Sequence, residues 1–407
     1  MRRAGPPQAS NSAPPGSSAA AKPQAWGDHT SPGYLKFASP LLDEATIAGV
    51  EAVLRSGHIA SGPWVQRFER ELSTCCGGRP VRVLTSATAA IEVALQLCGI
   101  GRGDEVVTSA QSFFTVLNMI VKVGATPVFV DCELVTRNID LAQTEAAIGP
   151  RTRAIVPTHY PGSLVDMDAL LALARRRGLR VIEDAALVIG SRCKGRNVGS
   201  FGDLTTFSFH PNKNITSIEG GALVVNDEAE AKRVEALRFH GITVLPDRTR
   251  DVAFPGGKFN LPDVNARIGC AQLERLPEFL ARRRTLAERY FEQLATDPPC
   301  VLPPRPDPDG EYSWNMFCVL LPLDRLKASR KDIRDGLEAR GIGTGVSYEA
   351  LHLSTLGRQH GGREGQFPNA ERIARETLTL PLHAGMSRED VDRVCVALAE
   401  VLAASRR

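Results

Sequence analysis

The sequence predicts an α/β protein with a large, mostly parallel sheet sandwiched by helices and a smaller C-terminal α/β domain. Between residues 81 and 183, short β-rich runs alternate with amphipathic stretches, a pattern typical of parallel strands joined by helices on both faces. The 407 residues, 43% of them hydrophobic, are enough for two packed domains. A proline-rich break over 298–309 sets off the C-terminal part of the chain.

Each element follows from its own local pattern. Apolar residues at helical spacing predict helices, the first of which starts at Leu42 and ends at Gly57, and β-branched runs predict strands. Up to Glu183 the expected order is helices at 42–57 and 64–72, strand 81–84, helix 87–98, strand 105–109, helix 114–123, strand 127–130, helix 141–147, strand 154–158, helix 166–177 and strand 180–183. Beyond it we expect a strand at 204–209, helices at 227–239 and 264–295 (the second long and open to a break), a strand at 312–321, a helix at 330–340, an extended element at Val346, and helices at 369–377 and 388–402.

The expected domain organisation has three parts. Residues 1–30 are rich in Pro, Ala, Ser and Gly, and such a segment cannot bury enough surface to offset its ordering entropy, so we expect a disordered tail. Residues 31–295 form the large domain, which includes an N-terminal helical segment, and residues 296–407 form the small domain.

Composition narrows the class of protein. Basic and acidic residues nearly balance, 49 against 46, which argues against partners such as nucleic acid or an anionic membrane. No apolar run reaches membrane-spanning length, and the N-terminus lacks the apolar region of a secretory signal. Nine scattered cysteines without metal-ligand spacing indicate reduced thiols, a cytoplasmic location and no metal site.

The most informative stretch runs from Val181 to Val224. A strand-like run ends at Asp184, and a later one ends just before Lys213, 213 − 184 = 29 residues further on. A carboxylate and a lysine at strand ends suit a pyridine-aldehyde cofactor, because the carboxylate can keep the ring nitrogen protonated while the lysine forms a Schiff base. Taken alone, a lysine is usually a solvated surface group, and an acidic pair can simply cap a helix.

Two motifs in this stretch resemble a known family. The run SFHPNKN, residues 208–214, is followed by Glu-Gly-Gly at 219–221. In this the chain is similar to the DegT/StrS group of sugar aminotransferases, which are fold-type I pyridoxal-phosphate enzymes, and the resemblance covers about residues 35–402. It implies that Lys213 forms the Schiff base with pyridoxal 5'-phosphate and moves a proton in the reaction, for which its pKa must fall from about 10.4. It also implies that Asp184 pairs with the pyridinium nitrogen.

The same resemblance assigns other groups to the cofactor. Ala87 and Thr88, at a strand-to-helix junction, would bind the phosphate together with Ser208, and Phe113 would stack on the ring. A plain helix cap at residues 86–88 and a core position for Phe113 remain open alternatives. His159 follows a family pattern, and a structural histidine is at least as good an interpretation as a catalytic one.

Several positions depart from the family pattern. Leu187 stands where a glutamine commonly contacts the phenolic oxygen of the cofactor. Lys258 replaces an asparagine that reaches the cofactor phosphate of the neighbouring subunit; it is a candidate ligand for that anion or a surface residue. Asn315 replaces a frequent histidine.

A further departure lies close to the C-terminal domain's expected extended element. Ser347 replaces the first histidine of a His-Tyr…His pattern, of which Tyr348 and His352 remain. Tyr348 and His352 are therefore candidates for substrate contact. The core chemistry is retained while the substrate pocket is not typical.

The leading hypothesis is thus a homodimeric aminotransferase with shared active sites. Its substrates would be L-glutamate or glutamine as donor and a keto-sugar, nucleotide-linked in most of the family, as acceptor, in surface polysaccharide or secondary-metabolite biosynthesis. One alternative is a cofactor-binding regulator without turnover, although no helix-turn-helix module is evident. Another is a sugar dehydratase of the same fold, which would carry histidine instead of Lys213. A generic nucleotide-binding protein ranks last, because no GxGxxG or P-loop pattern occurs.

Overall fold

The computed structural model describes residues 33–160, 162–295, 300–306 and 310–407. Residues from Leu35 to Arg407 form one compact unit. The expected tail, residues 1–30, lies outside the described residues. The division into two domains near residue 296 stays a prediction.

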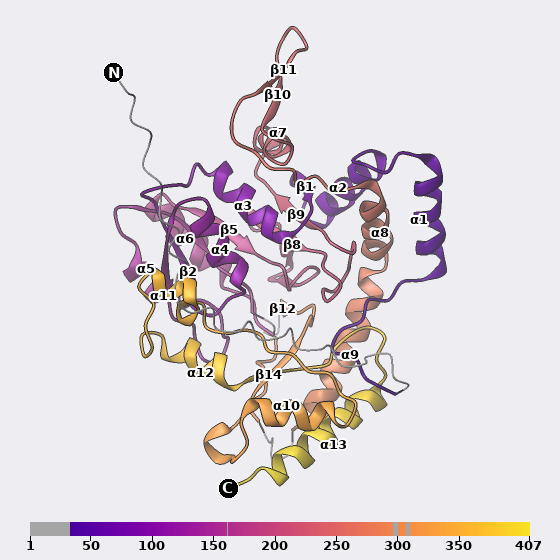
Figure 1. The fold of residues 1–407 in the computed structure, drawn as a ribbon, viewed down its shortest axis with the longest axis vertical. Helices are drawn as coiled ribbons and strands as arrows, with labels where there is room; N and C mark the ends of the chain where they lie inside the picture. Colours follow the sequence, from indigo (N-terminus) through magenta and orange to yellow (C-terminus); the bar gives the residue numbers. More distant parts are fainter. Residues whose placement is uncertain (1–32, 161, 296–299, 307–309) are drawn as a thin grey trace, which may run out of the picture. The chain divides into compact units, whose positions relative to one another are not determined.

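A seven-stranded sheet lies at the centre of the unit (Figure 1). The strand order is β1-β9-β8-β5-β4-β2-β3, and only β9 runs antiparallel to its neighbours. The strands are β1 (Val81–Leu84), β2 (Glu105–Ser109), β3 (Thr126–Val130), β4 (Thr152–Val156), β5 (Arg180–Asp184), β8 (Leu204–Ser208) and β9 (Gly221–Val224). The predicted mostly parallel sheet is confirmed, whereas β9 had no counterpart among the expected strands.

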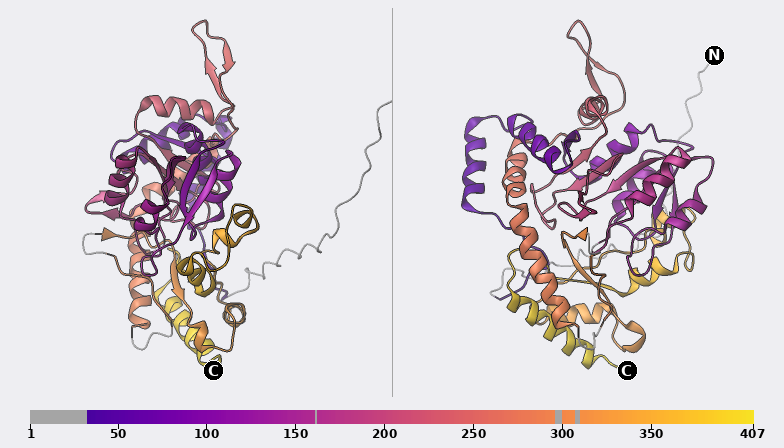
Figure 2. Two further views of the ribbon diagram at one scale, coloured as in Figure 1. Left: turned by 90° about the vertical axis from the view of Figure 1, so that its left-hand side faces the viewer. Right: turned by 180° about the vertical axis from the view of Figure 1, so that it is seen from behind.

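Helices cover both faces of this sheet (Figures 1 and 2). On one face a cluster of buried side chains joins the sheet to α3 (Ala87–Leu97), α4 (Phe114–Lys122) and α7 (Glu228–Leu237). On the other face, α6 (Met167–Arg177) packs at one end, beside α5 (Leu141–Ala147). At the other end lie α2 (Pro63–Cys75), α8 (Asp263–Glu274) and the start of α9 (Leu276–Gln293), and α1 (Glu44–Ser56) packs on α8.

The C-terminal part is built around a second hydrophobic cluster. Here the far half of α9 packs against α10 (Arg330–Glu338), α13 (Arg388–Ala404) and an antiparallel pair, β13 (Phe317–Leu320) and β14 (Thr377–Leu380). The remaining elements are α11 (Thr355–Gln359), α12 (Pro368–Glu376), the 3-10 turns at Leu323–Arg325 and Leu351–Leu353, the small sheet of β6 (Arg192–Cys193), β7 (Arg196–Asn197) and β12 (Gly310–Glu311), and the hairpin β10 (Ile242–Val244) and β11 (Arg250–Val252). This hairpin projects away from the sheet beyond α7 (Figures 1 and 2).

The long helix expected over 264–295 is broken, as its sequence allowed, whereas the strand expected over 312–321 is shorter than expected. The helix expected over 264–295 breaks at Arg275, and Pro277 lies in the first turn of α9, where proline is tolerated. The strand expected over 312–321 begins only at Phe317, because Trp314 has a φ of 45° and cannot continue an extended strand.

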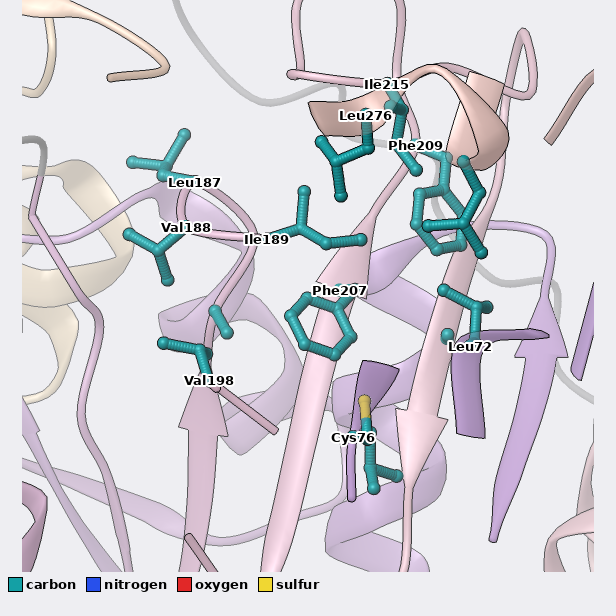
Figure 3. Packing of buried hydrophobic residues seen from close by; sticks show 14 of the residues in the cluster. Leu72, Cys76, Leu187, Val188, Ile189, Val198, Phe207, Phe209, Ile215 and Leu276 are labelled. Atoms are coloured by element: carbon teal, nitrogen blue, oxygen red, sulfur yellow. The ribbon is translucent and has the colours of Figure 1, made fainter. Parts of the chain in front are cut away.

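The largest hydrophobic cluster lies between the sheet and α2, α8 and α9 (Figure 3). Phe207 points from β8 toward Leu72 of α2 and toward Cys76, which follows α2, and Leu276 of α9 lies nearer Phe209 and Ile215 in the same cluster. The loop after β5 adds Leu187, Val188 and Ile189 to the same cluster. This loop is therefore anchored by apolar burial directly after Asp184.

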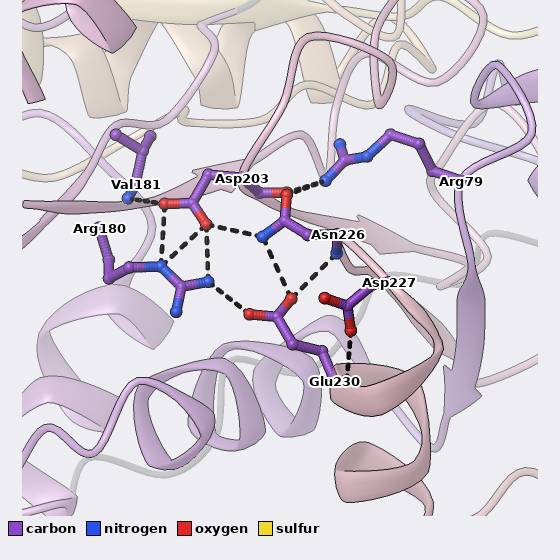
Figure 4. A network of polar contacts seen from close by, with 7 residues as sticks. All are labelled: Arg79, Arg180, Val181, Asp203, Asn226, Asp227 and Glu230. Carbon is purple, nitrogen blue, oxygen red and sulfur yellow. Dashed lines mark hydrogen bonds and ion pairs between the residues drawn. The ribbon is translucent and has the colours of Figure 1, made fainter. Parts of the chain in front are cut away.

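A polar network joins β5, β8 and β9 at the edge of the sheet where β5 and β8 begin (Figure 4). Asp203, just before β8, accepts hydrogen bonds from the Arg180 guanidinium at 2.7 and 2.9 Å and from the Val181 amide at 2.6 Å. Arg180 also pairs with Glu230 at 2.9 Å, and Asn226, just after β9, donates to Asp203 at 3.2 Å. Because the network fixes the amino ends of β5 and β8, it sets where their carboxyl ends lie.

Helix α2 receives its cap from a distant residue. Its N-cap, Gly62, has no side chain, and the fully buried Asp263 accepts hydrogen bonds from the amides of Gly62 at 2.8 Å and Val65 at 2.9 Å. A carboxylate at a helix N-terminus satisfies amides that would otherwise lack a partner.

Within the described residues, no helix combines the length and the apolar character needed to cross a membrane. The same part of the chain contains no group of three or more His, Cys, Asp or Glu side chains arranged to hold a metal ion. Cys132, Cys270 and Cys318 are among the buried free thiols.

We predict that Asp263→Ala lowers the free energy of unfolding by about 2–3 kcal/mol, because buried amides of α2 lose a charged acceptor. Urea unfolding of the cofactor-free protein measures this change. Glu364→Ala, at an exposed position, is the control and should change stability by no more than about 0.5 kcal/mol. Equal stability of both variants would contradict the capping role.

Candidate active site

The candidate site lies at the edge of the sheet where β2, β4, β5 and β8 end. Polar residues follow each of these strands: Gln111 and Ser112 after β2, Thr158 after β4, Asp184 at the end of β5 and Ser208 at the end of β8. The carboxyl ends of parallel strands are where ligands bind in open α/β sheets.

Asp184 is a buried carboxylate, 2% exposed. Its Oδ1 accepts a hydrogen bond from the Ala186 amide at 3.1 Å, and its Oδ2 accepts one from the Thr158 hydroxyl at 3.4 Å. Burial raises the pKa of Asp184, and the Ala186 amide and the charge of Lys213 act against that rise. The carboxylate is thus held by two hydrogen-bond donors, and the charge of Lys213 favours its ionised form.

Lys213 lies in the turn that follows β8, and its amide donates to the His210 carbonyl at 2.9 Å. Burial lowers the pKa of its ammonium to about 8, and the charge of Asp184 opposes this change. A lysine with this pKa is partly neutral near pH 8, which a nucleophile or base requires. Asp184 and Lys213 are thus near enough for the charge of each to affect the pKa of the other, and their roles toward the cofactor stay predictions.

Two aromatic rings meet beside this pair. Phe113, the N-cap of α4, is 47% exposed, and its ring centroid lies 5.3 Å from that of Tyr348. Burial raises the pKa of Tyr348, and the charges of Cys318, Tyr160 and Asp184 add to the rise. Since Phe113 is exposed, a position in the hydrophobic core is not its role.

The start of α3 forms the third side of the site. The Ser86 side chain caps the helix by accepting from the Ala89 amide at 3.0 Å, and the Thr88 hydroxyl lies 2.5 Å from that of Thr115. Gly221 of β9 packs directly against this helix start, where an added Cβ would lie 2.3–2.5 Å from backbone atoms of Ser86 and Ala87. The Glu-Gly-Gly motif therefore permits a close approach of two backbones.

Ser208 and His159 complete the strand ends. Ser208 is 8% exposed, and its Oγ accepts from the His210 amide at 3.5 Å. The fully buried His159 accepts from the Val165 amide at Nδ1, so its Nε2 carries the proton and donates to Glu183 at 2.7 Å. With both nitrogens satisfied behind Asp184, His159 has the environment of a structural histidine.

Leu187 belongs to the hydrophobic cluster of Figure 3 and is 3% exposed. Its carbonyl accepts from the Ser313 hydroxyl at 3.3 Å. Position 187 thus contributes apolar packing and a main-chain acceptor, and no side-chain hydrogen bond.

Lys258 and His352 have surroundings of their own. Lys258 is exposed, donates to Asn260 and lies 4.9 Å from the Phe239 ring centroid. His352 is fully buried, with Nε2 3.1 Å from Glu371, and burial lowers its pKa. Neither side chain contacts Asp184 or Lys213 among the described residues, so their roles toward phosphate and substrate stay predictions.

Sequence reasoning missed several polar groups around the site. Ser112 and Thr158 share a hydrogen bond at 2.7 Å next to Asp184, and Gln111 donates to the Tyr348 carbonyl at 3.3 Å. All three follow the ends of parallel strands, and that position was a signal that could have identified them. Asn315 contacts the Lys213 turn from far along the chain, which no local pattern indicates.

These residues fit pyridoxal phosphate. A helix N-terminus with hydroxyls nearby suits a phosphate, the exposed ring of Phe113 offers a surface for a flat heterocycle, and the buried Asp184 offers an acceptor to a protonated ring nitrogen. Lys213, with its lowered pKa, offers an amine to an aldehyde.

Comparisons with known proteins agree with this class. The model of the DegT/DnrJ/EryC1/StrS aminotransferase family matches residues 40–399. The spore coat polysaccharide biosynthesis protein SpsC of Bacillus subtilis is 37% identical over 382 residues, which cover 91% of this chain and 97% of SpsC.

Solved structures give the same result. Spr1654 from Streptococcus pneumoniae, in its PMP form, has a TM-score of 0.87 at 31% identity and covers 91% of this chain and 98% of its own; a PLP form is also solved. PseC from Helicobacter pylori, an aminotransferase involved in the biosynthesis of pseudoaminic acid, has a TM-score of 0.85 at 26% identity, with coverages of 91% and 100%.

The fold and these relatives define a pyridoxal-phosphate-dependent enzyme of the sugar aminotransferase class. The chain belongs to the DegT/DnrJ/EryC1/StrS aminotransferase family.

We predict that Gly221→Ala separates β9 from the start of α3, lowers stability by about 1–3 kcal/mol through overpacking and weakens cofactor binding. Equilibrium dialysis with pyridoxal phosphate and urea unfolding measure the two effects. Gly101→Ala is the matched control, because its added Cβ would meet only the Val123 carbonyl at 3.7 Å. If Gly221→Ala bound pyridoxal phosphate with wild-type affinity, the close approach of β9 to α3 would have no part in phosphate binding.

We also predict the pH dependence of Lys213. Because its folded pKa is lowered from 10.5 to about 8, the neutral amine predominates above about pH 8. The rate at which cofactor-free protein captures pyridoxal, trapped with borohydride and measured on the Lys213 peptide, should rise with pH through about 8 and then level off. A midpoint near 10.5 would show that Lys213 is not held in a buried environment.

Proposed function

We propose that this chain transfers an amino group from L-glutamate, or glutamine, to a nucleotide-linked keto-sugar. The pathway we propose is surface polysaccharide or secondary-metabolite biosynthesis. The observation that carries the proposal is the buried carboxylate of Asp184 together with the half-buried Lys213, whose pKa is lowered to about 8, at the carboxyl edge of the sheet in a chain of this family. The names of SpsC and PseC support a role with sugars that are built into larger products.

Each residue of the site has a proposed task. Pyridoxal phosphate, when bound, supplies an aldehyde that takes up the donor amine and a ring that accepts electrons. Lys213 holds the cofactor covalently at rest and then moves a proton, which its pKa of about 8 permits. Asp184 accepts a hydrogen bond from the protonated ring nitrogen and so keeps the ring positively charged.

The remaining contacts orient and enclose the cofactor. Ala87, Thr88 and Ser208 hold the phosphate, with amides at the start of α3 and two hydroxyls. Phe113 covers one face of the ring. Tyr348, whose ring lies 5.3 Å from that of Phe113, and His352 contact the substrate.

We propose that the enzyme is a homodimer in which the two copies share active sites. Support comes from apolar side chains on the projecting hairpin, where Val244 is 70% exposed and Val252 66% exposed. Such side chains are typical of surfaces that another chain covers. Lys258 pairs in a β-bridge with Phe239 near the base of this hairpin, and we propose that it contacts the cofactor phosphate of the other copy.

Two further proposals concern organisation. The small domain, residues 296–407, closes over a large acceptor, as mobile domains do in many enzymes. Buried free thiols such as Cys132 and Cys318 support a reducing, cytoplasmic location.

The first test is the visible absorbance of the cofactor-loaded protein before and after L-glutamate. We expect the band of the covalently held cofactor to disappear and the band of the aminated cofactor to grow. Lys213→Ala should bind the cofactor without a borohydride-stable link and should lose at least about 10²-fold in turnover, the loss typical of removing a group that transfers a proton. Lys232→Ala, on the surface of α7, is the control.

The outcomes separate the competing functions. A band that ignores glutamate, glutamine and other amino acids would favour the regulator without turnover. Full transaminase activity in Lys213→Ala would overturn the proposed mechanism. Dehydration of a keto-sugar without amino transfer would favour the dehydratase, which the lysine at position 213 argues against.

A further inference from the structure

Asn315 lies against the turn that carries Lys213, although the two are separated by about a hundred residues of chain. Its Nδ2 donates to the Asn212 carbonyl at 3.1 Å and to the Asn214 Oδ1 at 3.0 Å. One carboxamide therefore contacts the residue on each side of the lysine.

A third hydrogen bond ties the same two segments together. The Asn214 Nδ2 donates to the Ser313 carbonyl at 3.0 Å. Asn214 and Asn315 are 5% and 4% exposed, so the bond between them and the bond from Asn214 to Ser313 lie away from water, while the bond to Asn212 is partly buried. We call the Asn315 and Asn214 side chains, with the Ser313 carbonyl, the asparagine clamp.

The far side of the clamp is itself fixed. The buried Arg283 of α9 donates to the carbonyls of Asn315 at 3.1 Å and Trp314 at 3.3 Å. Ser313 donates through its hydroxyl to the Leu187 carbonyl at 3.3 Å and through its amide to Ser191 at 3.0 Å. Residues 313–315 are thus a rigid support that α9 and the loop after β5 hold in place.

The turn itself has little support of its own. Its internal main-chain bond from Lys213 to His210 measures 2.9 Å, and the exposed His210 side chain contacts only Asn212 and Glu219 in the described structure. Without the clamp, the residues on both sides of the lysine would be free to rearrange.

We propose that Asn315 is a positioning residue that holds the Lys213 turn in its reactive place. The proposal rests on the role of Lys213 under the proposed function. Displacements of about 1 Å at a reacting group can reduce rates by about 10²-fold, so the clamp matters for chemistry even though Asn315 does not touch the reacting atoms. The buried environment that lowers the pKa of Lys213 depends on the same placement.

The test compares four variants of the full-length, cofactor-free protein. Asn315→Leu keeps the size of the side chain and removes both donors. Asn315→His restores an N–H group, and Asn214→Ala removes the acceptor and the third bond. Asn212→Ala is the matched control, because the clamp binds its main-chain carbonyl while its side chain contacts only His210.

The main readout is the pH midpoint at which Lys213 captures pyridoxal, trapped by borohydride and measured on its peptide. In Asn315→Leu and Asn214→Ala we expect the midpoint to move from about 8 toward 10.5, because water reaches the ammonium when the turn loosens. Asn315→His should recover part of the shift, and Asn212→Ala should keep the wild-type midpoint. With pyridoxal phosphate and glutamate, the rate of the first half-reaction should fall about 10- to 100-fold in Asn315→Leu.

Several results would overturn the proposal. One is a folded Asn315→Leu, judged by circular dichroism and thermal midpoint, that keeps both the wild-type pH midpoint and the rate. Another is an equal shift in Asn212→Ala. If Asn315→Leu fails to fold, Asn214→Ala decides in the same way. Because capture of pyridoxal needs no turnover, an inactive wild-type enzyme would count against the proposed function and leave the clamp comparison valid.

Discussion

The candidate site is organised around the buried Asp184 and the half-buried Lys213, whose charges act on each other. A charge removed from water is unfavourable unless donors or an opposite charge compensate it, and burial accordingly raises the pKa of Asp184 and lowers that of Lys213. The attraction between the two groups opposes both shifts. The surrounding strand ends, with Thr158 and the Ala186 amide, hold the carboxylate where this attraction operates.

The two edges of the central sheet have different physical tasks. At the amino edge, the network of Arg180, Asp203 and Glu230 is satisfied by its own members and fixes the positions of β5 and β8. At the carboxyl edge, Asp184 ends β5 and Lys213 lies in the turn after β8, and both groups have shifted pKa values. Contacts that stabilise the fold thus lie at one end of these strands and reactive groups at the other. The stabilising end can therefore offset the cost of removing charged groups from water at the reactive end.

Departures from the family pattern acquire physical meaning only in the folded chain. Leu187 replaces a polar residue, yet its side chain joins the hydrophobic cluster and its carbonyl supports Ser313. Asn315 replaces a histidine and binds the Lys213 turn. Both positions belong to one connected set of contacts that links the loop after β5, α9 and the lysine. A change at one of them therefore affects the others more than its distance along the chain suggests.

The sequence by itself determined the alternating strands and helices, the mostly parallel sheet, and the roles expected for Asp184 and Lys213, because periodicity and motifs are local properties of the chain. Only the tertiary structure decided that β9 runs antiparallel, that His159 is satisfied by Glu183 and Val165, and that Asn315 meets the lysine turn. These features depend on which distant segments come into contact. Such contacts follow from the packing of whole elements and from the need to pair every buried polar group, and no stretch of sequence specifies them alone.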